Sequence, residues 1–561
     1  PDVRLGLSPG AGATQRLPRF LGARGALELL LSGQACQAED RRLKRLIARL
    51  VDSDPVPVAL DLARALADRG RWQRSRDVET GFSDPEGYQA VIADMRRQLR
   101  QLDSAEARIV SCVEAAQLFP FEQGLAFEQA RFTDGLATPE ARGLRHALVA
   151  ERRAATLQTP QPAGVGAAPV RTVALTGGES WLGELACVCL EAGLEVMLAA
   201  DTPEAAQPLR LQVERILRAA PAQDGGNEAA IEDRLGRLRP TGSDGFAAAD
   251  LVIDAGERPP GNVPTLKAGA IWAVARAGVA PGERAAAVGA AGRGVALRLS
   301  RPAHVRTIGE YALAPDTAPD VGGLLVRIFG RLGRCLIRTA PPAGQVTGRL
   351  SAALNMAALE LVKQGADPYT VDRAARGGGF SSAPFERMDR DGLGNVAHQV
   401  GKYRRKLGLA ATAPGVLSAL TDLGRTGRGA GRGFYLHADG RAKPDAALTP
   451  LLQGLTLGTA AAAMTEAQIK TALIGAVVNE AAALLSGAVV DRASDIDLLM
   501  IREFGFDRRK GGPLFQADLQ GIFPLFKQMQ SLAHLSPLWG PHALLQDMVK
   551  NGQGFFGRGV T

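Results

Sequence analysis

The feature that most restricts the fold is an alternation of short apolar runs with helical patterns in the middle of the chain. The runs, in order, read "VRTVALTG", "EVMLAAD", "ADLVIDAG", "GAIWAVA" and "GVALRLS". Strands that alternate with helices in this way are typical of a doubly wound parallel sheet. We therefore expect an α/β domain of the Rossmann-like kind.

A loose internal repeat follows from about residue 343, where the pattern becomes helical. The segment "LNMAALELVKQGADPYTVDRAARGGGF" recurs as "VNEAAALLSGAVVDRASDIDLLMIREFGF". The two copies pair Asn355 with Asn479, Asp372 with Asp497, Gly379-Phe380 with Gly505-Phe506, and Asp389 with Asp518. Two copies of one helical unit predict a duplicated all-α domain that packs on itself.

Length and charge narrow the class of protein. A chain of 561 residues exceeds what a single core usually holds, so several domains are expected. The net charge of +8 comes from arginines scattered along the chain without a basic stripe, which argues against nucleic acid as a partner. We find no apolar stretch long and charge-free enough to predict a transmembrane segment. The chain begins without methionine, so we expect it to be a fragment.

Cysteines and histidines give no metal-binding pattern. The five cysteines are odd in number, and the one close pair, Cys187 and Cys189, lies in an apolar helical pattern. Buried reduced thiols in a reducing compartment are therefore expected, and no metal site is predicted.

The stretch "VALTGGESWLGELA" resembles the start of a dinucleotide-binding domain, but its glycines are irregular. A G-x-G-x-x-G loop turns the chain, lets the pyrophosphate approach and packs helix on strand. Neither Gly177 nor Gly178 starts a register with all three glycines, although Gly183 fits the last position of the second. In the register that starts at Gly177, Glu179 takes the position of the second glycine, where its carboxylate would face the phosphates. Asp201 follows the next strand and could bind the adenosine ribose, or it could cap the following helix.

Several segments together resemble the multifunctional enzymes of fatty-acid β-oxidation, which join an enoyl-CoA hydratase (crotonase) domain to an L-3-hydroxyacyl-CoA dehydrogenase. The segments are "PDVRLGLSPGAGATQRLPRFLG", "VEAAQLFPFEQGLAFEQARF", "TPEARGLRHALVAER", "GRGFYLHADGRAKPD" and "RASDIDLLMIREFGFDRRKGGPLFQAD". The resemblance implies acyl-CoA thioesters as substrates, NAD as cofactor and a cytoplasmic location of the bacterial type. It also implies a thiolase subunit as a possible partner.

The resemblance also implies a division of the chain into five parts. They are a C-terminal part of a crotonase-like domain (1–80), a helical linker region (81–168), a Rossmann-like NAD-binding-type domain (169–340), and two copies of the dehydrogenase C-terminal helical domain (341–440 and 441–561). Within the second part, composition predicts a flexible linker at 159–169.

The hydratase site is incomplete in this sequence. The family places a catalytic glutamate directly after the proline that opens its "PxxxLGxxPG" motif, and this chain has Asp2 there. Aspartate keeps the charge, but its carboxylate reaches about 1.5 Å less far. The other carboxylate lies upstream in the family. A solvated residue is therefore the alternative interpretation of Asp2.

The dehydrogenase site is altered at its centre. The family pattern HFFxPxHxxxxxE reads here "RLSRPAHVRTIGE", so Arg298 holds the position of the catalytic histidine and Glu310 that of its orienting carboxylate. Arginine stays protonated and cannot accept the substrate's proton, so we expect Arg298 to be inactive. His304 holds the second, non-catalytic position. The family's "NTSS" stretch reads "ARAG" here, from Ala275 to Gly278. A second family asparagine, at the start of the helical domain, aligns with Gly348.

Three functions stay open from the sequence. The first is a β-oxidation enzyme with both family activities. The second is a member with an impaired dehydrogenase half that serves as an acyl-CoA-binding or structural scaffold, and the site residues favour it. The third is a non-enzymatic assembly partner similar to the α subunit of a thiolase complex.

Overall fold

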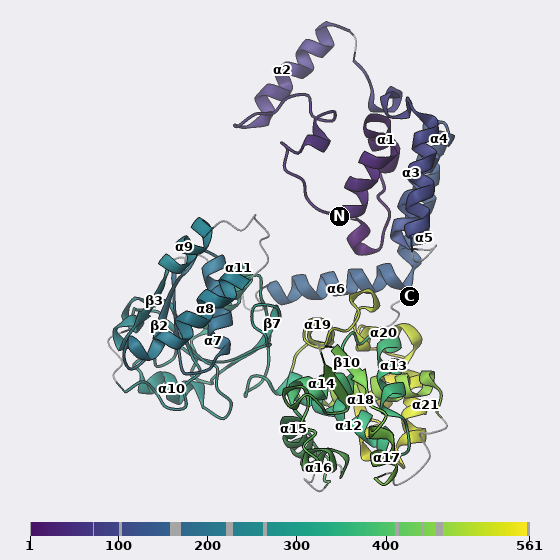
Figure 1. Cartoon of the computed structure of the whole chain (residues 1–561). Helices are drawn as coiled ribbons and strands as arrows, with labels where there is room; N and C mark the ends of the chain where they lie inside the picture. The colour runs from purple at the N-terminus through teal and green to yellow at the C-terminus, as the bar shows by residue number, and fades with distance from the viewer. Residues whose placement is uncertain are drawn as a thin grey trace. The chain divides into compact units, whose positions relative to one another are not determined.

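The computed structural model describes residues 2–70, 72–99, 104–156, 170–219, 228–261, 266–409, 415–438, 441–455 and 464–557. They form two compact units, Pro1–His146 with Arg508–Gly511, and Ala147–Asp507 with Gly512–Thr561 (Figure 1). The predicted linker at 159–169 lies outside the described residues.

The first unit is helical. Its helices are α1 (Ala13–Ser32), α2 (Pro55–Asp68), α3 (Pro85–Gln98), α4 (Ala105–Leu118) and α5 (Phe121–Ala137), followed by α6 (Pro139–Ala155), which continues into the second unit. A small core joins α1, α3 and α4 through Ala23, Leu27, Tyr88, Ile92, Ile109, Val110 and Val113.

The start of α1 is fixed by a carboxylate from α5. Gly12 has a left-handed backbone (φ 86°) and offers no capping side chain. The buried Glu128 accepts bonds from Gly12 N (2.5 Å) and Thr14 N (2.9 Å) instead. An acidic group at a helix N-terminus satisfies free N–H groups and favours the helix dipole. Glu128 therefore takes the place of an N-cap side chain at the start of α1.

The α/β part of the second unit is an eight-stranded sheet with the order β3-β2-β1-β4-β5-β6-β7-β8. The strands are β1 (Thr172–Thr176), β2 (Glu195–Ala199), β3 (Leu238–Thr241), β4 (Leu251–Asp254), β5 (Ile271–Val274), β6 (Gly294–Leu299), β7 (Ile308–Leu313) and β8 (Cys335–Arg338). All neighbours are parallel except β6 and β7, which are antiparallel. The doubly wound α/β fold is thus confirmed, with one antiparallel pair that the sequence did not indicate.

Helices cover both faces of this sheet. They are α7 (Trp181–Glu191), α8 (Gln207–Ala219), α9 (Glu228–Gly236), α10 (Pro281–Ala287) and α11 (Pro319–Arg331). Val173 and Leu175 of β1 join the core with α7, α8 and α11, whereas Ala174 faces the core with Ala285 of α10. Because both faces are covered, the central strands β1, β4 and β5 are buried along their whole length rather than in alternation. Cys187 and Cys189 are buried and unpaired in α7, as predicted.

The helical part of the second unit surrounds two long helices, α12 (Gln345–Lys363) and α18 (Glu466–Ser486), which pack against each other. The other elements are α13 (Pro368–Gly378), α14 (Pro384–Asp391), α15 (Leu393–Lys406), α16 (Gly415–Asp422), β9 (Tyr435–Ala438), β10 (Arg441–Pro444), α17 (Leu448–Gln453), α19 (Ala493–Arg502), α20 (Pro513–Gln520), α21 (Ile522–Leu532) and α22 (Ala543–Asn551).

The aspartates that recur in the repeat perform the same tasks in each copy. Asp372 accepts bonds from the backbone N–H groups of residues 385 and 386 at the start of α14, and Asp497 accepts them from residues 514 and 515 at the start of α20. Asp389 binds the N–H groups of residues 434 and 435, and Asp518 those of residues 555 and 556. Each aspartate thus holds the start of a later segment of its own copy.

The two copies meet at matching glycine–phenylalanine pairs. Phe380 and Phe506 form an antiparallel bridge, and their rings lie edge to face with centroids 5.2 Å apart. Ser381 N donates to Gly505 O (3.0 Å) and Asp507 N to Gly379 O (2.6 Å). The reciprocal bonds follow the repeat, as expected for related units that pack on each other.

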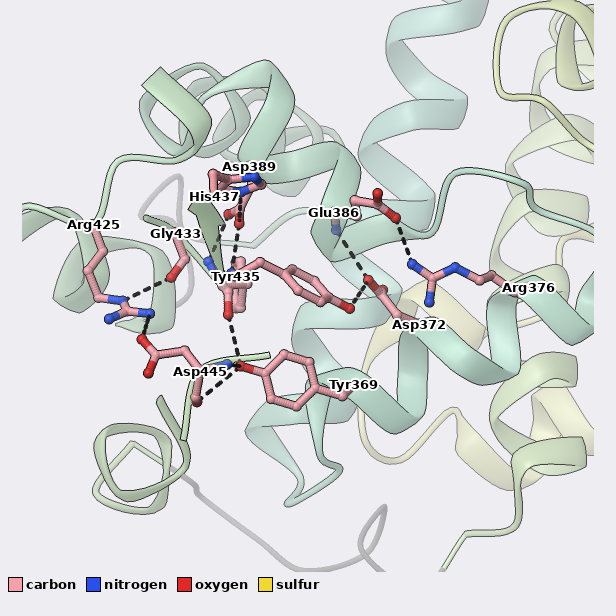
Figure 2. A network of polar contacts seen from close by, with 11 residues as sticks. Tyr369, Asp372, Arg376, Glu386, Asp389, Arg425, Gly433, Tyr435, His437 and Asp445 are labelled. Carbon is pink, nitrogen blue, oxygen red and sulfur yellow. Dashed lines mark hydrogen bonds and ion pairs between the residues drawn. The ribbon is translucent and has the colours of Figure 1, made fainter. Parts of the chain in front are cut away.

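The first copy also contains a buried polar network (Figure 2). Tyr435 Oη donates to Asp372 (2.8 Å), and His437 Nε2 lies 2.9 Å from Asp389 Oδ2. Burial raises the pKa of Asp372 to about 6. Tyr369 Oη donates to Phe434 O (3.0 Å), which ties the start of α13 to the β9 hairpin. Through Asp372 and Asp389, the network links α13, α14 and the β9 hairpin of the first copy.

The expectation that no stretch could span a membrane needs one amendment. Within the described residues, α18 meets the length and hydropathy that a membrane-crossing helix needs. It is also the central helix of this part of the chain, with residues such as Leu473, Val477 and Leu484 fully buried. Core helices of globular proteins pass the same test, so α18 gives only weak support for a transmembrane segment.

Candidate functional site

A groove of about 510 Å³ opens at the carboxyl ends of β1, β2 and β4. It is lined by residues 176–178, 200–201, 205, 246, 256 and 258–261. The position is the point of the sheet where the strand order reverses, because β1 lies between β2 and β4. Open α/β sheets bind their ligands at such a switch point.

Two of the predicted glycines shape the floor of this groove. Gly177 has φ 108°, and a Cβ there would lie 2.7 Å from the backbone of Ala255 and Gly256, so no other residue fits. At Gly178 a Cβ would meet nothing within 4 Å. The first glycine thus lets β1 approach the loop after β4, and the second leaves its backbone open to a ligand.

The third predicted glycine lies elsewhere. Gly183 does not line the groove; it faces α8, where a Cβ would lie 3.1 Å from Gln212 and 3.2 Å from Leu209. Its task is therefore close packing of α7 on α8. Asp201 does line the groove, and Thr202 rather than Asp201 accepts the bond from Ala205 N that caps the next turn. Asp201 thus remains available to a ribose.

Glu179, the acidic residue in the loop after β1, forms an ion pair with Arg276. Arg276 donates to Glu179 (3.2 Å) and to Glu257 (2.7 Å). Arg276 stands in the stretch where the family has its assisting polar residues. The pair removes part of the repulsion that Glu179 would exert on a pyrophosphate.

A buried ion pair fixes the loop after β4, and the sequence did not reveal it. Arg284 of α10 donates to Asp254 (3.0 Å) and to the carbonyl of Glu257 (3.0 Å), and Trp272 Nε1 donates to the same aspartate (3.1 Å). Burial raises the pKa of Asp254. The sequence does show an aspartate at the end of an apolar strand. It does not indicate that an arginine 30 residues away is the partner of this aspartate.

Arg298 occupies the position of the catalytic histidine near the end of β6, directly opposite Glu310 of β7. Its guanidinium donates to Glu503 (3.0 Å), Thr347 (3.2 Å) and Ser300 (3.3 Å). Burial opposes the charge, but the attraction of Glu503 and Glu310 outweighs it and raises the pKa above its usual value. Arg298 is therefore a fixed cation.

Glu310 is fully buried and caps a helix instead of orienting a base. Its carboxylate accepts bonds from the N–H groups of Gly344 (3.0 Å), Val346 (3.2 Å) and Thr347 (2.9 Å), and from the Thr347 hydroxyl. Although Glu310 lies opposite Arg298 in the sheet, the carboxylate that forms an ion pair with Arg298 is that of Glu503. Sequence reasoning missed Glu503, which lies 205 residues away.

The other histidine of the motif does not replace the missing base. His304 is exposed, and its Nδ1 lies 3.8 Å from Glu184 rather than beside Glu310. Asp2 belongs to the other unit, where it is half-buried and begins a short 3-10 helix, so its role stays a prediction. Among the described residues, no group of three or more His, Cys, Asp or Glu could hold a metal ion.

Beside Arg298 the second unit has a further cavity of about 450 Å³. It reaches from Trp181 at the start of α7 and Ala275 directly after β5 to Asn395 and His398 of α15. Arg301 lies over the Trp181 ring, 5.2 Å from its centroid. This cavity occupies the place between sheet and helices where a substrate would meet residues from both.

The site residues fit a dinucleotide only in part. The groove offers an open backbone at Gly178 and a carboxylate at Asp201 for the adenosine end. At the other end Arg298 stands where a proton acceptor is needed, and a guanidinium cannot take a proton. Arg298 therefore offers no proton acceptor for the oxidation of an alcohol by hydride transfer.

Comparisons with known proteins agree with this architecture. Residues 344–437 match the family model of the 3-hydroxyacyl-CoA dehydrogenase C-terminal domain. The peroxisomal bifunctional enzyme of Homo sapiens is 25% identical over 576 residues, which cover 96% of this chain and 78% of the relative. That of Cavia porcellus is 24% identical over 571 residues, with the same coverage.

Solved structures show the same fold. The 3-hydroxybutyryl-CoA dehydrogenase of Escherichia coli K12 superimposes with a TM-score of 0.55 and 20% identity, over 69% of this chain and 100% of that one. The dehydrogenase part of multifunctional enzyme 1 from C. elegans gives a TM-score of 0.55 with 16% identity, over 72% and 96%. The chain is therefore similar, over 96% of its length, to peroxisomal bifunctional enzymes, and it combines a Rossmann-like sheet with a helical part that matches the 3-hydroxyacyl-CoA dehydrogenase C-terminal domain.

Proposed function

We propose that the chain binds acyl-CoA thioesters as a β-oxidation homologue whose dehydrogenase half does not oxidise 3-hydroxyacyl-CoA. The observation that carries the proposal is Arg298, held at the histidine position by Glu503. Oxidation of the substrate's alcohol needs a group that accepts its proton as hydride leaves, and such a base typically contributes about 10²–10⁴-fold to the rate. A partly buried arginine with a raised pKa cannot supply this step.

Two further positions support the proposal. Glu310 uses both carboxylate oxygens on the start of α12, so it has little capacity left to orient a base. Gly348 stands where the family has an asparagine, and it lines the cavity next to Arg298. A Cβ at Gly348 meets nothing within 4 Å, so the missing side chain would have room.

The test is a spectrophotometric assay with 3-hydroxyacyl-CoA and NAD. The protein is expected to produce no NADH above background. The double variant Arg298→His, Gly348→Asn restores the two family residues and should raise the rate at least tenfold above that background. Arg301→His is the matched control, because it adds an imidazole to the same segment but not opposite Glu310. NADH formation by the unaltered protein would contradict the proposal.

The cofactor groove is expected to bind the adenosine end of a nucleotide without productive use of the nicotinamide. Asp201 and Gly178 serve the adenosine part, whereas the remainder of NAD meets Glu179 and its partner Arg276. Calorimetry with AMP and with NAD should therefore give similar dissociation constants, both weakened in Asp201→Ala but not in the control Glu204→Ala. A NAD affinity more than tenfold above that of AMP, a difference of about 1.4 kcal/mol, would show that the whole dinucleotide is recognised.

The partner and location predictions stay open. A thiolase subunit as partner would appear in a pull-down with the chain as bait, and its absence would count against an α-subunit-like role. The related enzymes are named peroxisomal, so a cytoplasmic location of the bacterial type stays a prediction that fractionation of the source cells tests.

A further inference from the structure

A second cavity next to the altered site is strongly basic. It has a volume of about 260 Å³ and five arginines in its lining, Arg298, Arg301, Arg306, Arg387 and Arg390. Its lining holds two carboxylates, Asp391 and Glu503, so the arginines exceed them by three positive charges. Like charges grouped in a partly enclosed space repel one another unless an anion lies among them.

Each carboxylate of the lining has an arginine partner, although Glu503 Oε2 is buried without a hydrogen-bond partner among the described residues. Glu503 Oε1 accepts a bond from Arg298 (3.0 Å), and the attraction of Arg298 contributes to a pKa of Glu503 below its usual value, although burial acts in the other direction. Asp391 lies 3.4 Å from Arg390 Nε. The excess positive charge therefore rests mainly on the remaining arginines.

Arg387 carries the strongest indication of a missing ligand. It is only 4% exposed, and its Nη2 donates to Asn355 (2.9 Å) while its guanidinium lies 4.7 Å from the centre of the Phe504 ring. Its Nε and Nη1 atoms are buried and have no hydrogen-bond partner among the described residues. Buried donors of a charged group are normally paired.

The geometry of these donors limits what can satisfy them. The N–H groups of Nε and Nη1 lie on opposite flanks of the guanidinium, so each needs an acceptor of its own, and the charged oxygens of a carboxylate or phosphate are strong acceptors for a guanidinium. Burial lowers the pKa of Arg387 to about 10, which still leaves it protonated at neutral pH. The matching ligand is therefore an oxyanion rather than a neutral group.

We propose that this cavity binds a compact oxyanion, a phosphate or carboxylate group, among its five arginines, with one of the unpaired N–H groups of Arg387 as a donor. The adjoining 450 Å³ cavity shares Arg298, Arg301 and Glu503 with it and has room for the organic part of a larger ligand. The site goes beyond the proposed function, because a dehydrogenase would present a neutral hydroxyl group near residue 298.

The first experiment titrates the full chain with inorganic phosphate by calorimetry. Arg387→Gln is expected to weaken phosphate binding at least tenfold, and Arg387→Lys should retain part of it because the charge remains. The control Arg373→Gln removes the same charge from an exposed position on α13, where Arg373 pairs with Glu466, and should bind as the unaltered protein does. Equal phosphate affinity in Arg387→Gln and Arg373→Gln would overturn the proposal.

A second pair of variants keeps the test valid if Arg387→Gln fails to fold. Gly348 lines the cavity and has open space at its Cβ position, so Gly348→Asp places a carboxylate inside without altering an arginine. This variant should lose phosphate binding at least tenfold relative to Gly348→Asn, which has the same size and no charge. It should also melt at a higher temperature than Gly348→Asn, because its charge substitutes for the missing anion. Equal phosphate affinity in the two variants would overturn the proposal.

Coenzyme A then distinguishes the sources of the oxyanion. If coenzyme A displaces phosphate and binds more weakly to Arg387→Gln, the site takes a phosphate of coenzyme A. If phosphate binds and coenzyme A does not displace it, the site takes a separate anion. Either result supports the oxyanion site, whereas coenzyme A binding that is unchanged in Arg387→Gln, together with no phosphate binding at all, would contradict it.

Discussion

Replacing Glu310 with alanine is expected to lower the free energy of unfolding by about 3–5 kcal/mol. The substitution leaves the N–H groups of Gly344, Val346 and Thr347 and the Thr347 hydroxyl without their acceptor at the start of α12. It also removes a negative charge that helps to hold the partly buried Arg298. Chemical unfolding followed by circular dichroism measures the effect.

Two control variants separate the causes of this loss. Glu310→Gln keeps one oxygen of the same shape and should recover part of the stability. Glu257→Ala removes an exposed carboxylate that pairs with Arg276, and it should change the unfolding free energy by less than about 1 kcal/mol. A Glu310→Ala variant as stable as Glu257→Ala would show that α12 does not depend on this carboxylate.

Asp389→Ala is expected to destabilise the chain by about 3–5 kcal/mol, clearly more than the equivalent change Asp518→Ala in the second copy. Both aspartates accept two backbone N–H groups at 2.8–2.9 Å. Asp389 is only 1% exposed and also contacts His437, whereas Asp518 is half-buried. The same lost bonds should therefore cost less at Asp518, about 1–2 kcal/mol, because water can replace the carboxylate there.

The two variants form a matched pair, because each removes an aspartate that accepts two backbone N–H groups in the same protein. Thermal unfolding of both variants should give a lower midpoint for Asp389→Ala. Equal midpoints would mean that burial of the polar network in Figure 2 contributes little beyond the two backbone bonds.

Much of the fold could be predicted because it depends on local patterns. Five apolar runs became β1, β2, β4, β5 and β6, since strands covered on both faces are mostly apolar. The more weakly marked β3, β7 and β8 were not identified, and the antiparallel pairing of β6 with β7 depends on contacts that no local pattern encodes. The repeat could be read because each copy needs the same aspartates and glycines.

The candidate site was predicted less completely. Gly177, Gly178 and Asp201 line one groove, as their positions directly after two predicted strands suggest, but Gly183 serves the packing of α7 on α8. The partners of Arg298 and Arg284 lie 205 and 30 residues away, respectively, beyond the reach of any spacing argument.

The sequence by itself determined the α/β sheet, the duplicated helical domain and the presence of a guanidinium in place of an imidazole, because hydrophobic periodicity and side-chain chemistry are properties of the chain alone. The tertiary structure decided that Glu503 rather than Glu310 pairs with Arg298, and that Arg387 is buried with unpaired donors beside it. Such pairings depend on which distant segments of the chain pack together in one low-dielectric interior. Only the packed fold decides this.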